Sequence, residues 1–312
     1  MPLAALSAPP AGRPCAAPEG ERTPWRQVLG PLRNGGADPT TRFGPGHLVR
    51  GTWTPDGPGT IRLAWTCDGG VVQADAWGPG AGWLLGRAPA MLGLLDVPHR
   101  FTAGHPLVLR AQHLHPPVRI GASGTLYHEL LPTILAQRIT AREAVAQWRR
   151  LCTRLSEPAP GPFSGLLLPP APERLARLPT WWFHPLGVER SRAATLVEVA
   201  RHASKLFAWA ELPAGEAGRR LALLSGVGEW TVGVVLASAL GEPDAIAVGD
   251  FHLKHQVAWN LAGEPRATDE RMLELLEPYR GHRGRVVRLL HLEGSGAPKY
   301  GPRQRIVPMH RW

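Results

Sequence analysis

Two glycines, Gly226 and Gly228, interrupt an apolar, helix-forming stretch at residues 221–240, LALLSGVGEWTVGVVLASAL. Glycine lets the chain bend sharply and lets a ligand approach the backbone closely. We therefore predict a helix over Glu216–Leu224, a tight turn, and a second helix over Glu229–Ala239. The free N–H groups at the start of the second helix attract anions such as phosphate, although an ordinary helical hairpin would show the same pattern.

An aspartate with two interpretations follows this hairpin. Asp250 lies 22 residues beyond Gly228, in the segment AVGDFHL, directly before a predicted helix over Asp250–Leu261. A lone aspartate in that position usually caps a helix. Its occurrence together with the glycine turn favours a shared functional site.

The first third of the chain predicts an antiparallel sheet. Short runs rich in Val, Ile, Thr and Trp predict strands over His47–Thr54, Thr60–Thr66 and Gly70–Trp77. A helical segment follows near Trp83–Leu95. From about Gly121 apolar residues recur at helical spacing, behind a capping box at Thr140. The further predicted helices lie at 145–155, 196–210, 268–276 and 283–292.

These patterns predict an α+β protein in three parts. Residues 1–22, rich in Pro and Ala, are expected to be a flexible arm. Residues 23–118 form a small antiparallel α/β sheet domain, and residues 119–312 form an all-α bundle.

The charge of the chain points to an anionic partner. The formal net charge is +10, and only three of the 35 basic residues are lysine. Arginine suits bidentate phosphate and guanine contacts, so nucleic acid is the favoured partner, although a GC-rich genome would also enrich arginine. The sequence contains no apolar run of about 18 residues, so no membrane-spanning helix is predicted.

The three cysteines Cys15, Cys67 and Cys152 are far apart and form no CxxC or four-cysteine pattern. We therefore expect no iron–sulfur cluster. The N-terminus has no basic start before its short apolar run, so a secretory signal is not expected either. A reduced, cytoplasmic protein is the simplest expectation.

The hairpin LLSGVGEWTV and the segment VGDFHLKHQVAW together resemble the helix-hairpin-helix (HhH-GPD) DNA glycosylase superfamily. The resemblance is to bacterial 3-methyladenine DNA glycosylase II, and ILAQRITAREAVAQW, LGVERSRAATLVEVA and LEPYRGHRGRVVRLL extend it over about residues 119–292. It implies two helical subdomains with the active cleft between them. The sheet domain fits by position and strand count.

The resemblance assigns Asp250 as the catalytic carboxylate, which stabilises the oxocarbenium-like sugar and helps to position water. In bifunctional members a hairpin lysine forms a Schiff base with the sugar. Here Trp230 stands at that place and cannot act as this nucleophile, so the resemblance implies a monofunctional enzyme. Val234 and Arg288 replace a tyrosine and an aromatic residue of some members. The expected base pocket contains Trp230, Val234, Phe251 and Arg288.

The resemblance also assigns DNA contacts. The residues expected at the DNA are Gly226, Val227, Gly228, Glu229, Thr231, Gln137, Arg138, Arg280 and Arg283. Arg138 stands where many members have an apolar wedge that fills the gap left by the flipped base. The resemblance allows for a structural monovalent cation on the backbone carbonyls of Ala222, Leu224 and Val227.

We therefore expect a monomeric DNA glycosylase that acts on alkylated bases, such as 3-methyladenine, in double-stranded DNA and requires no cofactor. Two alternatives remain open. The same scaffold acts on oxidised, deaminated or bulky lesions in one of them. In the other, the chain is a non-catalytic DNA-binding or lesion-sensing protein in which Asp250 is only a helix cap.

Overall fold

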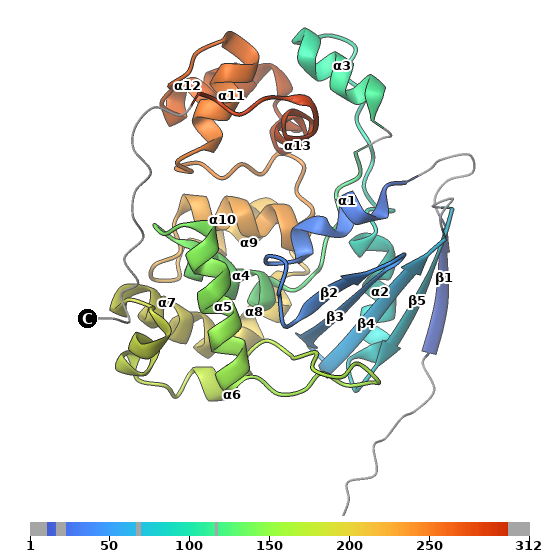
Figure 1. Cartoon of the computed structure of the whole chain (residues 1–312), viewed down its shortest axis with the longest axis vertical. Coiled ribbons are helices and arrows are strands. Elements are labelled where there is room, and N and C mark those ends of the chain that lie inside the picture. The colour runs from blue at the N-terminus through green and yellow to red at the C-terminus, as the bar shows by residue number, and fades with distance from the viewer. Residues whose placement is uncertain (1–10, 17–22, 67–69, 116–117, 299–312) are drawn as a thin grey trace, which may run out of the picture.

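The computed structural model describes residues 11–16, 23–66, 70–115 and 118–298. A five-stranded antiparallel sheet lies beside two groups of helices (Figure 1). The predicted α+β class is confirmed. Among the described residues, no helix is both long enough and apolar enough to cross a bilayer.

The sheet is antiparallel throughout, because each strand pairs with a neighbour running the other way. Ile61 and Leu63 are fully buried and face the core, as the alternation of apolar and polar residues predicts. Thr54 pairs with Gly57 across a two-residue turn. The strand order is β1 (Ala11–Ala16), β5 (Val71–Trp77), β4 (Gly57–Trp65), β3 (His47–Thr54) and β2 (Thr41–Gly44).

One face of the sheet is covered by a helix, and the other face is covered only in part. Helix α2 (Ala81–Met91) packs on one face through Leu84 and Ala88. The other face carries Val49 against the loop residues Ala159 and Leu166, and α4 (Leu126–Ala136) lies against β3. On this second face Arg62 of β4 is partly exposed, and Val71 and Gln73 of β5 are exposed, so that part of the sheet is open to solvent.

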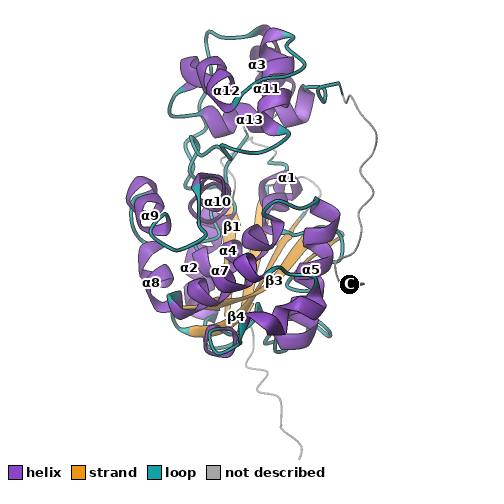
Figure 2. Cartoon of the chain, turned by 90° about the vertical axis from the view of Figure 1, so that its left-hand side faces the viewer, coloured by secondary structure: helices purple, strands orange, loops and turns teal. Residues whose placement is uncertain are grey.

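The first helical group, which we call the α4 lobe, surrounds α4 (Figure 2). Ten of the eleven residues of α4 are buried, so it is the central helix. Thr140 caps the next helix by accepting the N–H of Glu143, as predicted. The other helices are α5 (Ala141–Leu155), α6 (Pro172–Leu175), α7 (Arg190–Arg201), α8 (Ala203–Trp209), α9 (Ala214–Leu221) and α10 (Glu229–Val235), which a π-helical turn over Leu236–Leu240 continues.

The second group, which we call the α13 lobe, has its own core. It contains α3 (Pro106–Leu114), α11 (Leu253–Ala262), α12 (Asp269–Leu276) and α13 (Arg283–Glu293) (Figure 1). Helix α1 (Trp25–Leu29) lies between this lobe and the sheet in both views.

Segment 243–247 joins the lobes at very close range. A Cβ atom added to Gly233 of α10 would lie 2.0 Å from the Ile246 carbonyl oxygen. One added to Gly284 of α13 would lie 2.5 Å from that of Ala245. The segment therefore runs between two helix backbones that only glycine allows to approach so closely.

The structure corrects several expectations from the sequence. Ala11–Ala16 pairs with β5, so this part of the expected flexible arm is a strand. Helix α3 packs against α13 and not on the sheet, so the expected 23–118 domain does not include it. The helix expected over 196–210 is divided at His202, and the one expected from Asp250 begins at Leu253. Strand β2 and helix α1 were not predicted, because each is too short for a periodic pattern.

Candidate active site

A cavity of about 380 Å³ opens between the α4 lobe and the α13 lobe. Its walls come from α4, from α10 with its π-helical turn, from residues 245–256 and from α13. The volume lies in the range of about 300–1,000 Å³ that is usual for small-molecule sites. The polar side chains in the wall are Asn34, Glu129, Thr133, Ser238, Asp250, His252, Gln256, Arg288 and His291.

Asp250 lines this cavity, and both of its carboxylate oxygens are held. Oδ1 accepts the backbone N–H groups of His252 at 2.8 Å and Leu253 at 2.9 Å. Oδ2 accepts the indole N–H of Trp230 at 3.2 Å. Asp250 thus holds the turn that begins α11 and lines the cavity, and its catalytic role stays a prediction.

A second aspartate fixes the loop that carries Asp250. Gly249 has a φ of +88°, and its N–H donates to Asp269 Oδ1 at 2.9 Å. The ammonium of Lys254 binds Asp269 Oδ2 at 2.7 Å. Burial would raise the pKa of Asp269, but the hydrogen bonds from Lys254 and Gly249 hold that pKa below its usual value.

The glycine hairpin turns at Gly226, whose φ is +82°. A Cβ atom there would lie 1.9 Å from Thr195 Oγ1. Gln137 Nε2 donates to the Gly226 carbonyl and to Thr231 Oγ1, both at 2.9 Å, so this side chain braces the hairpin from the α4 lobe. Around Gly228 a Cβ atom would meet nothing within 4 Å, so its glycine is not required by the protein's own packing.

Three more residues of the expected DNA contact region lie in or beside this hairpin. Val227 is buried in the core of the α4 lobe, and Thr231 is buried under Gln137, so only their backbone groups stay candidates for the predicted DNA contact. Glu229 is exposed in the first turn of α10. Phosphate binding at this helix start stays a prediction.

Arg138 has an unusual backbone conformation. Its φ is +59°, and it is the one non-glycine residue with positive φ in the part of the chain that the structure describes. Such a conformation is costly for an arginine and persists where the surroundings impose it, often at functional sites. Arg138 is exposed beside the hairpin-bracing Gln137, a placement that fits the predicted wedge.

Two arginines of the expected DNA contact region, Arg280 and Arg283, lie at or just before the start of α13 and pair with carboxylates. Arg280 is exposed and pairs with Glu277 at 2.6 Å. Arg283 pairs with Asp244, whose hydrogen bonds raise the pKa of Arg283. Arg283 is held by Asp244 in a partly buried pair, whereas the exposed pair of Arg280 is weak and leaves its guanidinium available. Phosphate contact by either residue stays a prediction.

The predicted base pocket is only half assembled. Val234 and Arg288 line the cavity, whereas Trp230 and Phe251 do not. Phe251 is 68% exposed, although its neighbours Asp250 and His252 both line the cavity. Burial, together with the charge of Arg285, lowers the pKa of Arg288 to about 10, which leaves it charged at neutral pH.

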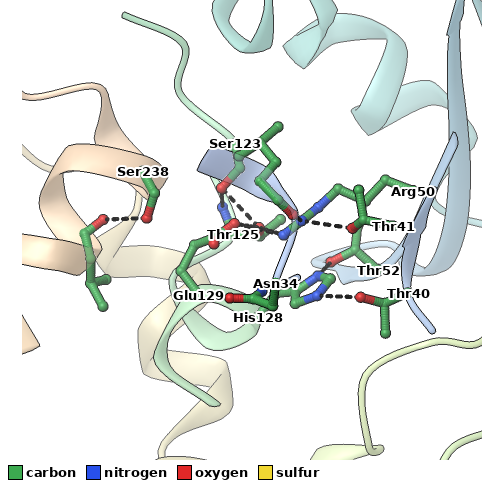
Figure 3. A network of polar contacts seen from close by, with 12 residues as sticks. Asn34, Thr40, Thr41, Arg50, Thr52, Ser123, Thr125, His128, Glu129 and Ser238 are labelled. Atoms are coloured by element: carbon green, nitrogen blue, oxygen red, sulfur yellow. Dashed lines mark hydrogen bonds and ion pairs between the residues drawn. The ribbon is translucent and has the colours of Figure 1, made fainter. Parts of the chain in front are cut away.

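The cavity includes residues that the sequence analysis missed, and Glu129 is the clearest case. Glu129 is an acidic residue within the otherwise mostly apolar helix α4. An acid in such a segment was the sequence signal that could have identified it. Its Oε1 binds Arg50 at 2.6 Å in a buried network that also contains Thr125 (Figure 3). Since Arg50 neutralises it, Glu129 is a structural acid, and Asp250 is the cavity carboxylate without a cationic partner among the described residues.

The hairpin carbonyls offer neutral oxygen ligands. The Leu224 oxygen accepts the Val227 N–H at 3.0 Å and keeps a second lone pair. Backbone carbonyls of this kind are suitable ligands for a monovalent cation, so the turn fits the expected site, which stays a prediction. No group of three or more His, Cys, Asp or Glu side chains among the described residues could hold a metal ion; Cys67 and residues 1–10 lie outside them.

Comparison with known proteins gives a likeness of structure and not of sequence. No family model and no curated protein matches the chain. The 3-methyladenine DNA glycosylase of Archaeoglobus fulgidus superposes with a TM-score of 0.72 at 17% identity, over 90% of this chain and 98% of that one. The chain has the DNA glycosylase fold. This confirms the fold that the resemblance implied.

Glycosylases with another substrate share this fold. The 8-oxoguanine glycosylase/lyase of Clostridium acetobutylicum superposes with a TM-score of 0.61 at 11% identity, over 88% of this chain and 93% of that one. The same enzyme in complex with double-stranded DNA gives a TM-score of 0.61 at 13% identity. The glycosylase fold is therefore common to enzymes for methylated and for oxidised purines, and the lesion must be argued from the cavity.

Proposed function

We propose that the chain is a monofunctional DNA glycosylase that hydrolyses the N-glycosidic bond of alkylated purines, of the 3-methyladenine type, in double-stranded DNA. The observation that carries this proposal is Asp250, a fixed carboxylate in the wall of a cavity large enough for a base. A base within a duplex must be flipped out to reach such a cavity. The sugar gains positive charge as the base leaves, and a carboxylate beside it stabilises that charge.

The lysines of the chain support hydrolysis without strand cleavage. A Schiff base requires a neutral amine near the sugar. Trp230 occupies the hairpin position where the resemblance would place such a lysine. Lys254 is near Asp250 in sequence, but its ammonium is paired with Asp269 and does not line the cavity.

Arg288 supports a second candidate substrate. Its guanidinium lines the cavity without a hydrogen bond or ion pair to any described residue. A cation there disfavours a positively charged alkylated base and favours a neutral base that presents a carbonyl oxygen. Deaminated and oxidised purines have this property, so they are the alternative on the same scaffold.

Base release from duplex DNA tests the proposal. We expect the wild-type protein to release methylated purines, and Asp250→Asn to lower the rate by about 10²–10⁴-fold. Asparagine keeps the shape and the acceptor for the backbone N–H groups, so DNA affinity should persist. Strand breaks should appear only after alkali treatment.

Each contrary result has one meaning. Strand breaks before alkali treatment would refute the monofunctional assignment. Release of hypoxanthine or 8-oxoguanine, with methylated bases left in place, would show that deaminated or oxidised purines are the substrate. Retained DNA binding with no base released from any lesion would support the non-catalytic alternative.

A further inference from the structure

A second, smaller cavity of about 170 Å³ lies against the proposed base pocket. It is bounded by α1, by the chain at residues 118–119 and by the last two turns of α13. Most of its wall is apolar, and the residues that form this apolar wall are Pro24, Val28, Pro31, Val118 and Leu292. We call this space the side cavity.

The side cavity is contiguous with the base pocket. Pro31, Arg288 and His291 line both spaces. On α13, residues 284, 287, 288 and 291 face the base pocket, and residues 288, 291 and 292 face the side cavity. Because each helical residue advances about 100°, these two sets are neighbouring stripes on one helix. The two spaces therefore lie next to each other on α13, with the side chains of Arg288 and His291 between them.

The size of the side cavity suggests what it holds. At about 170 Å³ it is smaller than the ~300–1,000 Å³ that a small-molecule site usually needs, so it does not suit a separate ligand. An apolar cavity of about 150 Å³ can hold one benzene ring. The side cavity is therefore suited to a single ring attached to a base that is bound in the adjacent base pocket.

Arg288 stands at the boundary and is able to move. It makes no hydrogen bond or ion pair with any described residue, although its cationic neighbour Arg285 is fixed by Asp96 at 2.6 Å. Its aliphatic stem can pack against a hydrocarbon, and its guanidinium can lie over an aromatic face. The boundary between the two spaces is thus a flexible side chain and not backbone.

We propose that the side cavity is a subsite for a benzene-sized hydrocarbon substituent on the flipped base, so that the protein removes N-benzylpurines as well as N-methylpurines. This inference rests on the proposed glycosylase function and names a wider substrate class for the same site. The reaction is the same hydrolysis. The oxygen of water bonds to the sugar C1′, the electron pair of the C1′–N bond leaves with the cationic base, and the remaining proton passes to solvent.

The test compares two lesions in one DNA. Duplexes carrying both 7-methylguanine and 7-benzylguanine are incubated with enzyme, and the released bases are counted by mass spectrometry. We expect the wild type to release both. Two variants that fill the side cavity, Leu292→Trp and Val118→Phe, should lower the benzyl-to-methyl ratio by about 10- to 100-fold, since a phenyl group then loses its buried site.

Two further variants complete the set. Arg288→Ala removes the flexible boundary and should raise the benzyl-to-methyl ratio. Leu114→Trp adds the same bulk on an exposed part of α3, away from both cavities, and should leave the ratio and the activity unchanged. Melting temperatures of all variants identify any that are misfolded, and the two filling variants act as independent checks on each other.

Binding separates this inference from the proposed function. Duplexes with a 2′-fluoro sugar resist hydrolysis, so their dissociation constants report the subsite alone. Tighter binding of the benzyl lesion, lost in Leu292→Trp, supports the subsite even if no base is ever released and the glycosylase proposal fails. Release of 7-methylguanine without 7-benzylguanine, or filling variants that change both lesions equally, would overturn the subsite.

Discussion

At the scale of single residues, the site is organised by backbone N–H groups. Asp250 accepts two of them, and Asp269 accepts the N–H of Gly249 directly before it. Gly249 has positive φ, so the turn into Asp250 is a conformation that few residues would hold without support. Asp269 is therefore a positioning residue for the proposed catalytic carboxylate.

Replacing Asp269 separates its two contacts. Asp269→Asn keeps an oxygen for the Gly249 N–H, and we expect base release within about threefold of wild type. Asp269→Ala removes that acceptor and should lower kcat by about tenfold, with KM little changed because the DNA contacts remain. Single-turnover kinetics measure both. Equal losses in the two variants would show that the ion pair to Lys254 matters instead.

The sequence was most informative at this residue scale. Gly226 and Asp250 were predicted because their chemistry is specific, and the structure places Asp250 in the cavity wall. Phe251 was misplaced because a neighbour in sequence can leave the cavity within one residue. Asn34 and Glu129 were missed because they reach the cavity from segments about 200 and 120 residues away from Asp250, a separation that no local pattern records.

At the scale of elements, a buried polar network joins α4 to the sheet. The ring nitrogens of His128 lie 3.1 Å from Thr40 Oγ1 and 3.0 Å from Thr52 Oγ1 (Figure 3). Burial, with a smaller effect of Arg50, lowers the pKa of His128 well below its usual 6.5. Burial therefore favours the neutral form of the ring in the folded protein.

This neutral histidine makes stability depend on pH. Because the pKa of His128 is lower in the folded chain than in the unfolded chain, the unfolded chain binds this proton more readily, so the free energy of unfolding falls as pH falls. We therefore expect the wild type to be less stable at pH 5.5 than at pH 7.5. Urea denaturation at the two pH values should show this loss in the wild type and in His113→Gln, an exposed control, but not in His128→Gln. An equal loss in His128→Gln would assign it to other groups.

The elements themselves were predicted unevenly. Strands β3 and β5 were predicted nearly residue for residue, because alternation and flanking turns define them. The π-helical turn after α10 was not predicted, because residues 236–240 have the same apolar pattern as a regular helix. The place of α3 depends on its contact with α13, and local propensity carries no information about such a partner.

At the scale of the whole molecule, a buried ion pair links the chain that leaves the sheet to the α13 lobe. Asp96 binds Arg285 with both oxygens, at 2.6 and 3.0 Å, and the two side chains are 8% and 2% exposed. Arg285 is thus a structural residue of the α13 lobe. Removing one partner of this buried pair would lower the stability of the fold, because the other charge would remain buried and unpaired.

Breaking this pair should destabilise the fold. We expect Asp96→Ala to lower the free energy of unfolding by about 3–5 kcal/mol. Glu277→Ala, which breaks the exposed pair with Arg280, should lower it by less than about 1 kcal/mol. Urea denaturation at pH 7.5 compares the two. Similar small effects would show that solvent reaches Arg285 in solution.

The close passage of segment 243–247 between α10 and α13 has a mechanical consequence. With backbone against backbone at Gly233 and Gly284, neither helix can slide along the other without a clash. Interfaces packed in this way move between discrete arrangements and do not stretch continuously. These close backbone contacts therefore fix the distance between the two helices, and with it the width of the proposed base pocket. Under the proposed function, base flipping would then rely on deformation of the DNA, and the fixed size of the cavity would limit which bases fit.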